Sequence, residues 1–243
     1  MKLDPQFYHL NTPGHLFKTK FAPELQRLVD VLEQRLLPVL NNDAICEEAK
    51  DLSEAEWERC MALPGTGDGC PSDFVGQAED VGASHWEAMN NVRQSLLNLY
   101  APVLLHAWEQ QLSHFWKGFL QPSGKPIQPQ DLNQSYINGY LAASGIDLTA
   151  FSSWQKIYEL RLVANTVKHA AGRSCDKLKR QRPELFTPPC FKGTGLEGNP
   201  FTCHGNAPLT DADFYLTLDD LKAYLDALLL FWKELEKALP TGN

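Results

Sequence analysis

Signatures of several common protein classes are absent from this sequence of 243 residues. It has no run of 18 apolar residues, which a membrane-spanning helix would need. It also has no Walker-type phosphate loop, no Rossmann glycine pattern, no HExxH motif and no G-x-S-x-G motif. The sequence therefore gives no support for nucleotide hydrolysis, dinucleotide redox chemistry, zinc proteolysis or hydrolase-type catalysis, and we expect no membrane span.

The six cysteines include no CxxC pair, and the first residues lack the apolar stretch of an export signal. We therefore expect reduced thiols and a cytoplasmic protein. Cys190, Cys203 and His204 offer three zinc-binding side chains, but their spacing matches no compact metal motif. We expect neither a metal ion nor a cofactor.

Strand-like alternation is scarce, whereas apolar residues recur with a helical period along nearly the whole chain, which predicts an all-α protein. Proline, glycine and helix-capping residues indicate where the helices begin and end. We expect helices from Pro23 to Pro38, from the capping box Ser53-Glu-Ala-Glu56, from the capping box Ser84-His-Trp-Glu87 to about Leu120, from Asp131 to about Ser144, from about Ser153 to Gly172, from Ser174 to about Gln181, and from Leu218 to about Leu239 after the cap Thr217.

Together these segments predict a bundle of four to five main helices, with a long loop rich in proline and glycine over residues 183–208, before the last helix. The stretch over residues 73–82 is polar and poorly patterned. We therefore divide the chain into an N-terminal helical extension with an acidic surface, residues 1–83, and a helical bundle, residues 84–243. We expect both parts to pack as one unit.

Three polar residues lie four positions apart on the helix expected before Gly172, namely Arg161, Asn165 and His169. Each step of four turns the side chain by only about 40°, so these residues form one polar stripe, with Lys168 just behind. A cation, an amide and an imidazole can hold a phosphate and transfer a proton. They can equally form hydrogen bonds to a neighbouring helix.

The segment 161–182 is strongly basic, with seven basic residues against one acid. Its net charge of +6 lies in a chain whose total is -8, so the remainder sums to -14. Such asymmetry is typical of a local site for a polyanion. The alternative is a basic surface helix that pairs with the acidic run over residues 43–58. The residues expected to bind nucleic acid are Arg173, Lys177, Lys179, Arg180 and Arg182.

His106 and Glu109 lie three residues apart and share one face of their helix. They can support the polar stripe, since a carboxylate beside an imidazole raises its pKa and fixes its tautomer. The other interpretation, which we favour, is a satisfied pair between packed helices.

The order of segments over residues 84–239 resembles the HEPN superfamily. The resemblance lies in two long helices, a helix with Arg161, Asn165 and Lys168-His169, a Gly-Arg-Ser turn, a basic helix, the run Arg182-Pro-Glu-Leu-Phe186 and a closing amphipathic helix. HEPN domains are small helical bundles found in bacterial toxins, abortive-infection and anti-phage systems, and several are ribonucleases. Their catalytic members place four to six residues between an arginine, commonly followed by a polar residue, and a histidine. Here seven residues separate Arg161 from His169, and Leu162 follows the arginine.

Two functions are open at this point. The resemblance implies a metal-independent endoribonuclease, in which His169 transfers protons, Arg161 and Lys168 stabilise the charge on the phosphorus, and Asn165 orients the phosphate or the imidazole. It further implies RNA as substrate, a cognate antitoxin or defence-system protein as partner, and a homodimer. The alternative is a non-catalytic module that binds RNA, a nucleotide or a partner protein through the basic segment 161–182.

Overall fold

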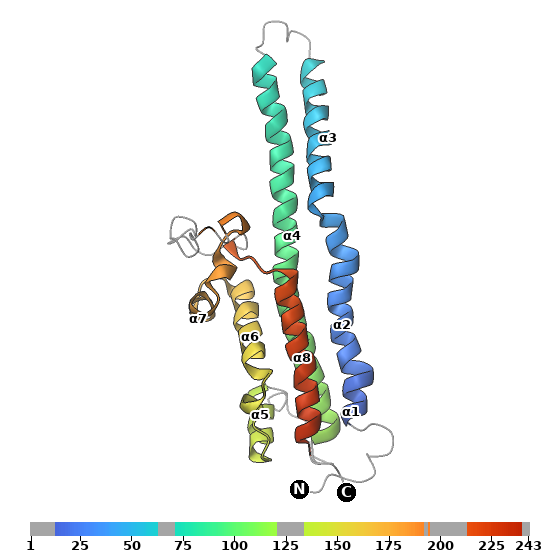
Figure 1. Ribbon diagram of the computed structural model, residues 1–243, viewed down its shortest axis with the longest axis vertical. Coiled ribbons are helices and arrows are strands. Elements are labelled where there is room, and N and C mark those ends of the chain that lie inside the picture. The colour runs from blue at the N-terminus through green and yellow to red at the C-terminus, as the bar shows by residue number, and fades with distance from the viewer. Residues whose placement is uncertain (1–12, 63–70, 121–133, 192–193, 195–212, 240–243) are drawn as a thin grey trace. The chain divides into compact units, whose positions relative to one another are not determined.

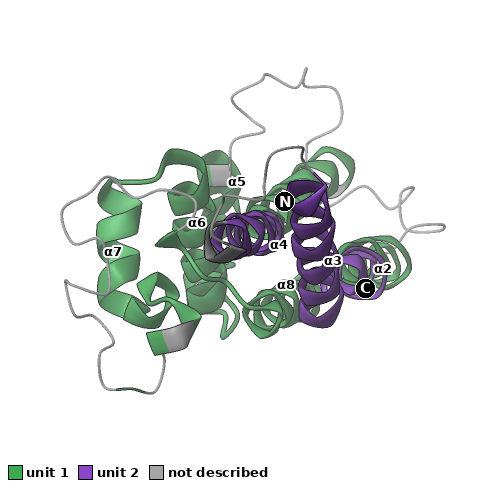
Figure 2. Cartoon of the chain, turned by 90° about the horizontal axis from the view of Figure 1, so that it is seen from above, with its two compact units in different colours: residues 1–30, 97–243 green, residues 31–96 purple. Residues whose placement is uncertain are grey.

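The computed structural model describes residues 13–62, 71–120, 134–191, 194 and 213–239. Every regular element within these ranges is a helix, which confirms the predicted all-α helical bundle (Figure 1). The chain forms two compact units (Figure 2). Unit 1 comprises residues 1–30 and 97–243, and unit 2 comprises residues 31–96.

The helices of unit 1 come from both ends of the chain. Long helix α4 enters this unit with its second half. The main elements are α1 (Pro13–Leu16), a π-helical turn (Phe17–Phe21), α2 (Ala22–Val31, whose last residue belongs to unit 2), α4 (Pro71–Phe115), a second π-helical turn (Trp116–Leu120), α5 (Gln134–Ala143), α6 (Trp154–His169), α7 (Arg173–Gln181) and α8 (Leu218–Ala238), with 3-10 turns at Leu148–Ala150, Pro183–Phe186 and Pro189–Phe191.

Trp232 of α8 lies at the centre of the aromatic core of unit 1. Its ring centroid is 4.7 Å from that of Phe17 and 4.8 Å from that of Phe21. Its indole N–H donates to the side-chain oxygen of buried Gln111 at 3.1 Å. The amide of Gln111 donates in turn to the carbonyl of Phe21 at 3.0 Å. Since a buried polar group needs a partner, this chain of bonds fixes how α4, α8 and the first helical segment pack.

Helix α8 begins as the sequence predicts. The hydroxyl of Thr217 accepts a hydrogen bond from the backbone N–H of Asp220, and the Asp220 carboxylate accepts one from the backbone N–H of Thr217. This reciprocal capping box satisfies donors that a helix start leaves unpaired. Behind it, one side of the helix is apolar and buried, through Leu221, Leu225, Leu228, Phe231, Trp232 and Leu235.

A short extended segment leads into α8 and is held from two sides. The side-chain amide of Asn98 donates to the carbonyl of Phe214 at 2.7 Å and accepts from the N–H of Leu216 at 3.3 Å. Between them, the N–H of Tyr215 donates to the carbonyl of Leu185 at 2.8 Å. These backbone groups therefore have partners although no strand lies beside them in the described part of the chain.

The start of α6, which the sequence places near Ser153, is held by a carboxylate from α8. Glu234 accepts hydrogen bonds from the backbone N–H groups of Ser152 and Ser153, at 2.8 and 3.2 Å, and from both hydroxyls. A negative charge at a helix N-terminus is favourable, because unpaired N–H groups point toward it. Glu234 thereby fixes the end of α6 against α8.

Unit 2 contains helical turns at Leu32–Leu36 and Leu37–Leu40, helix α3 (Asn42–Met61) and the first half of α4. Asn41 caps α3 by accepting from the N–H of Ala44 at 2.8 Å. Gly82 of α4 lies against α3 so closely that a Cβ atom there would come within 2.6 Å of the Ala49 carbonyl oxygen. The contact between these two helices therefore depends on a small residue.

Two expected helix starts are wrong. Ser53 lies inside α3, and Ser84 lies inside α4, whose start at Pro71 takes in the polar stretch 73–82. The buried positions there include two small residues, Ala78 and Gly82, while Val75 and Val81 are exposed, so large apolar residues do not mark the buried side of the helix. The expected boundary between residues 83 and 84 falls within α4. Of the expected loop 183–208, residues 183–191 form short turns, and most of the rest, with Cys203 and His204, lies outside the described residues.

We expect Glu234→Ala to lower the free energy of unfolding by about 1–3 kcal/mol, because it leaves the donors of buried Ser153 at the start of α6 without an acceptor. Urea denaturation checks this value. Glu236→Ala, two residues further along α8, is the matched control. It removes only an exposed ion pair with Lys18 and should cost less than about 1 kcal/mol. Equal losses in the two variants would contradict the capping role of Glu234.

The same interaction predicts a pH dependence. Burial raises the pKa of Glu234, but the hydrogen bonds from Ser152 and Ser153 lower it by more, so its pKa lies below the usual value. The contribution of Glu234 to stability is therefore present above the usual glutamate pKa and is lost as the pH falls through the lower pKa of the folded protein. The stability difference between the parent and Glu234→Ala should shrink over that acidic range.

Candidate functional site

Helices α6 and α7 carry nearly all the residues that the sequence singles out. Helix α6 buries Leu160, Val163 and Ala164, and α7 buries only Cys175 and Leu178. The other residues of α7 are exposed, apart from half-buried Ser174. The site therefore consists of a well-packed helix followed by a short helix whose polar side chains mostly face solvent.

The link between the two helices contains a strained residue. Ala170 has φ +52° and ψ -121°, the only positive φ of a non-glycine residue in the described ranges. A side chain makes this conformation unfavourable, by about 1–3 kcal/mol, whereas glycine adopts it freely. The strain sits directly after His169 and sets the direction in which α7 leaves α6.

The residues of the polar stripe do not come together in one site. The guanidinium of Arg161 lies 3.9 Å from the carboxylate of Glu109 on α4, and both side chains are about one-third exposed. Burial lowers the pKa of Arg161, an effect that the charge of Glu109 partly offsets. Arg161 is thus paired with a neighbouring helix, as the structural interpretation of the stripe expects.

The other members of the stripe lie further along α6. Asn165 is half-buried, whereas Lys168 and His169 are exposed in the last turn. The eight steps from Arg161 to His169 correspond to about 12 Å of rise, so their backbones lie about two helical turns apart on α6. Positive charge at the end of a helix is favourable by roughly 0.3–1 kcal/mol, which gives Lys168 a structural role without any ligand.

His106 and Glu109 have different partners. Glu109 contacts Arg161, while the exposed imidazole of His106 lies 3.3 Å from the side-chain amide of Gln110. Glu109 is therefore the member of this pair that the structure connects to the polar stripe.

Three cations share the exposed side of α7, namely Arg173, Lys177 and Arg180. Their spacing of four and three residues places them on one face, opposite buried Cys175 and Leu178. We call these three cations the basic face.

Two lysines of α7 lie beside aromatic rings. On the basic face, the ammonium of Lys177 donates to the hydroxyl of Tyr158 at 3.3 Å and lies 6.0 Å from the ring centroid. Lys179 points elsewhere, with its ammonium 5.4 Å from the ring centroid of Phe186. Lys177 is therefore the cation that connects the basic face to an aromatic residue of α6.

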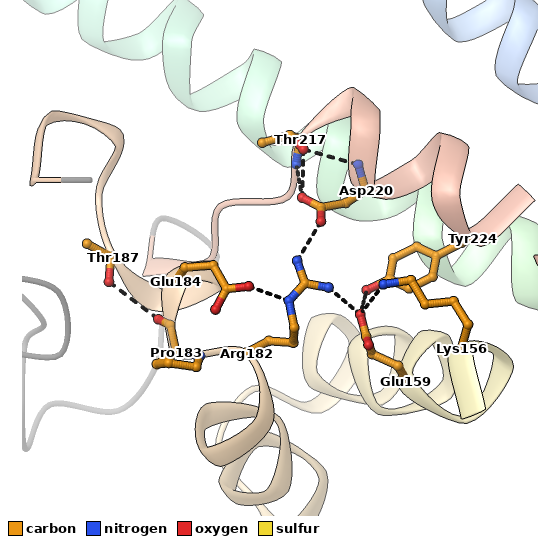
Figure 3. A network of polar contacts seen from close by, with 9 residues as sticks. All are labelled: Lys156, Glu159, Arg182, Pro183, Glu184, Thr187, Thr217, Asp220 and Tyr224. Atoms are coloured by element: carbon orange, nitrogen blue, oxygen red, sulfur yellow. Dashed lines mark hydrogen bonds and ion pairs between the residues drawn. The ribbon is translucent and has the colours of Figure 1, made fainter. Parts of the chain in front are cut away.

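Arg182, expected to bind nucleic acid, is instead occupied within the protein (Figure 3). Its guanidinium contacts the carboxylates of Glu159 on α6, of Glu184 just after α7, and of Asp220 in the first turn of α8, the last at 2.6 Å. The side chains of Arg182, Glu159 and Asp220 are at most 20% exposed. The anchor, as we call these four residues, joins the end of α7 to α6 and α8.

The two buried carboxylates of the anchor remain charged at neutral pH. Burial raises the pKa of Glu159, but hydrogen bonds from Lys156 and Tyr224 lower it by more. Burial likewise raises the pKa of Asp220, and hydrogen bonds from Thr217 and Arg182 reverse the shift. Both pKa values therefore lie below their usual range. Glu159 and Asp220 thus act as fixed negative charges for Arg182 near neutral pH.

The sequence gives little sign of the anchor. Arg182 stands at the end of a basic run, while Glu159 and Asp220 are 23 and 38 residues away from it. Only the capping role of Asp220, which follows from Thr217, could be inferred locally.

No family model, no curated protein and no solved structure matches this chain. In the described part of the chain, no three or more His, Cys, Asp and Glu residues are grouped so that they could hold a metal ion. None of the helices searched there is long and apolar enough to cross a membrane.

We expect Arg182→Met to lower the free energy of unfolding by about 3–5 kcal/mol, since it leaves buried carboxylates without a counter-charge. Arg182→Lys should recover only part of this loss, because one ammonium cannot reproduce a planar fork between three carboxylates. Arg180→Met, two residues earlier and exposed, is the control and should change stability by less than about 0.5 kcal/mol. Urea denaturation ranks the variants, and equal effects at positions 180 and 182 would contradict the anchor.

We expect Ala170→Gly to raise stability by roughly 1 kcal/mol through relief of backbone strain. Ala171→Gly at the next position is the control. Ala171 is exposed and has no positive φ, so glycine there should lower stability by about 0.4–1 kcal/mol through the entropy of the unfolded chain. Thermal unfolding of both variants shows whether each substitution raises or lowers the stability of the protein. A loss of stability in Ala170→Gly would contradict the strained conformation.

Proposed function

We propose that this protein is a non-catalytic module that binds RNA through the basic face of α7. The observation that carries the proposal is the arrangement of Arg173, Lys177 and Arg180, three exposed cations on one side of a nine-residue helix, in a chain whose net charge is -8. Asp176, the only acidic residue of α7, neighbours Arg173 and Arg180 at spacings of three and four residues and offsets one of these positive charges, so the face keeps a net positive charge. A local cationic surface on an acidic protein favours one confined contact with a polyanion.

The basic face suits a phosphate backbone. Arg173 and Arg180 lie about 10 Å apart along the helix axis, with Lys177 between them. Arginine forks and a lysine ammonium both donate to phosphate oxygens. Lys168, exposed in the last turn of α6, adds a further cation five residues before Arg173. RNA is the polyanion proposed here because the HEPN resemblance implies it.

Catalysis receives less support than binding. A ribonuclease site requires a proton-transferring group and a charge-stabilising group at one phosphate. Arg161 pairs with Glu109, and about 12 Å of helix rise separates its backbone from that of His169, so this arrangement does not bring the two to a common phosphate within one chain. The imidazole of His169 is exposed, without the packed surroundings that hold a catalytic group in place.

The wider setting is also a proposal, that of an HEPN-like protein of a bacterial defence or toxin system, in the cytoplasm, as a homodimer, and with an antitoxin or defence-system partner. Its support is the order of the segments: α4, α6 with Asn165 and Lys168-His169, basic α7, and amphipathic α8.

We expect the triple variant Arg173→Gln, Lys177→Gln and Arg180→Gln to weaken RNA binding and to flatten its salt dependence. Each phosphate contact on a single strand contributes about 0.7 to the slope of log K against log salt, so three lost contacts should reduce the slope by about 2. Fluorescence anisotropy with a labelled RNA over a salt series measures both quantities. The matched control removes three exposed cations elsewhere, through Lys20→Gln, Arg27→Gln and Arg35→Gln.

Two outcomes would overturn the proposal. The first is that the parent protein fails to bind RNA at low salt. The second is cleavage of RNA by the parent in the presence of EDTA, lost in a folded His169→Ala variant, which would assign a metal-independent endoribonuclease instead.

A further inference from the structure

Tyr158 of α6 is a half-buried aromatic residue beside the basic face. Lys177 of α7 donates to its hydroxyl at 3.3 Å. Arg161 lies three residues further along α6, about one helical turn from Tyr158. The tyrosine ring thus contacts a cation of α7 at a point where α7 meets α6.

We propose that Tyr158 is a stacking platform for a base of single-stranded RNA, while Lys177 and its neighbours on the basic face bind the adjacent phosphates. This inference deepens the proposed RNA binding and rests on it. The ligand class is a short single strand with unpaired bases. The contact requires no covalent step and no metal ion.

The contact between the ring of Tyr158 and the ammonium of Lys177 is the main support for single-strand binding. Proteins that bind single strands combine cations that follow the backbone with aromatic rings on which the bases stack. The contact between Lys177 and Tyr158 shows that one cation and one ring are within reach of the same ligand. The ammonium of Lys177 lies at the hydroxyl end of the ring, 3.3 Å from the oxygen and 6.0 Å from the centroid, so it does not cover the ring face. A base can therefore stack on that face while Lys177 binds the adjacent phosphate.

The size of the surface also favours a single strand. The basic face extends for only about 10 Å along α7, which covers a few nucleotides. A duplex keeps its bases stacked and paired inside the helix, so it offers phosphates to Arg173 and Arg180 but no base to Tyr158. The aromatic ring should therefore contribute to the binding of single strands alone, whereas the cations contribute to both forms.

The test compares four full-length proteins, namely the parent, Tyr158→Leu, Tyr158→Phe and Tyr136→Leu. Tyr136 is an exposed tyrosine of α5 and serves as the matched control. The probes are a short labelled RNA without self-complementarity and the same RNA annealed to its complement, both at low salt. Circular dichroism and thermal unfolding establish that each variant is folded.

We expect Tyr158→Leu to weaken binding of the single strand by about 5- to 150-fold, the effect of losing one stacked base. Tyr158→Phe keeps the ring and should bind within about 2-fold of the parent, since its stacking is unchanged. Duplex binding should be the same in all four proteins. A second readout uses the parent alone, because a single strand carrying 2-aminopurine should lose fluorescence when its base stacks on Tyr158.

The outcomes separate this inference from the function on which it rests. If the parent binds neither RNA at low salt, the proposed function fails and the inference with it. If the basic face is required for binding but Tyr158→Leu binds the single strand as tightly as the parent, or weakens both RNAs equally, the inference alone is overturned. Unchanged 2-aminopurine fluorescence on binding at every position of the probe would overturn it as well, even if Tyr158→Leu does not fold.

Discussion

The anchor at Arg182 is the interaction on which the arrangement of the candidate site depends. Helix α7 is short and buries only Cys175 and Leu178, so apolar packing alone holds it weakly. Arg182 follows the helix at once and binds carboxylates from α6 and α8. Buried ion pairs of this kind add little net stability over apolar packing, but they are strongly destabilising when one partner is lost. Their effect here is to specify where α7 ends.

The position of α7 determines the relation between the basic face and α6. Glu159 is part of the anchor, and the residue before it, Tyr158, receives the hydrogen bond from Lys177. The contact that fixes the end of α7 and the contact that joins ring and cation are thus adjacent on α6. Buried pairs are screened much less by salt than exposed cations are. Salt should therefore weaken RNA binding by the basic face much more than it weakens the ion pairs of the anchor that hold α7 in place.

The sequence predicts the fold better than it predicts the site. A helical period and the cap at Thr217 were enough for the all-α class and for α8, because both are local. The start of α4 was missed, since small residues, Ala78 and Gly82, are buried there while Val75 and Val81 are exposed. Arg182 resembled its basic neighbours because its acidic partners are distant in sequence. The pairing of Lys177 with Tyr158 depends on the turn at Ala170, a conformation that alanine does not signal.

The hydrogen bonds of Asn98 hold the chain just before α8 in one register. The side-chain amide of Asn98 forms hydrogen bonds with the backbone of Phe214 and Leu216, and the carbonyl of Leu185 accepts one from the N–H of Tyr215 between them. Contacts at three successive residues therefore set where α8 begins. A shift of one residue would leave buried groups at this point without partners. These three contacts therefore fix the phase in which α8 begins against the core.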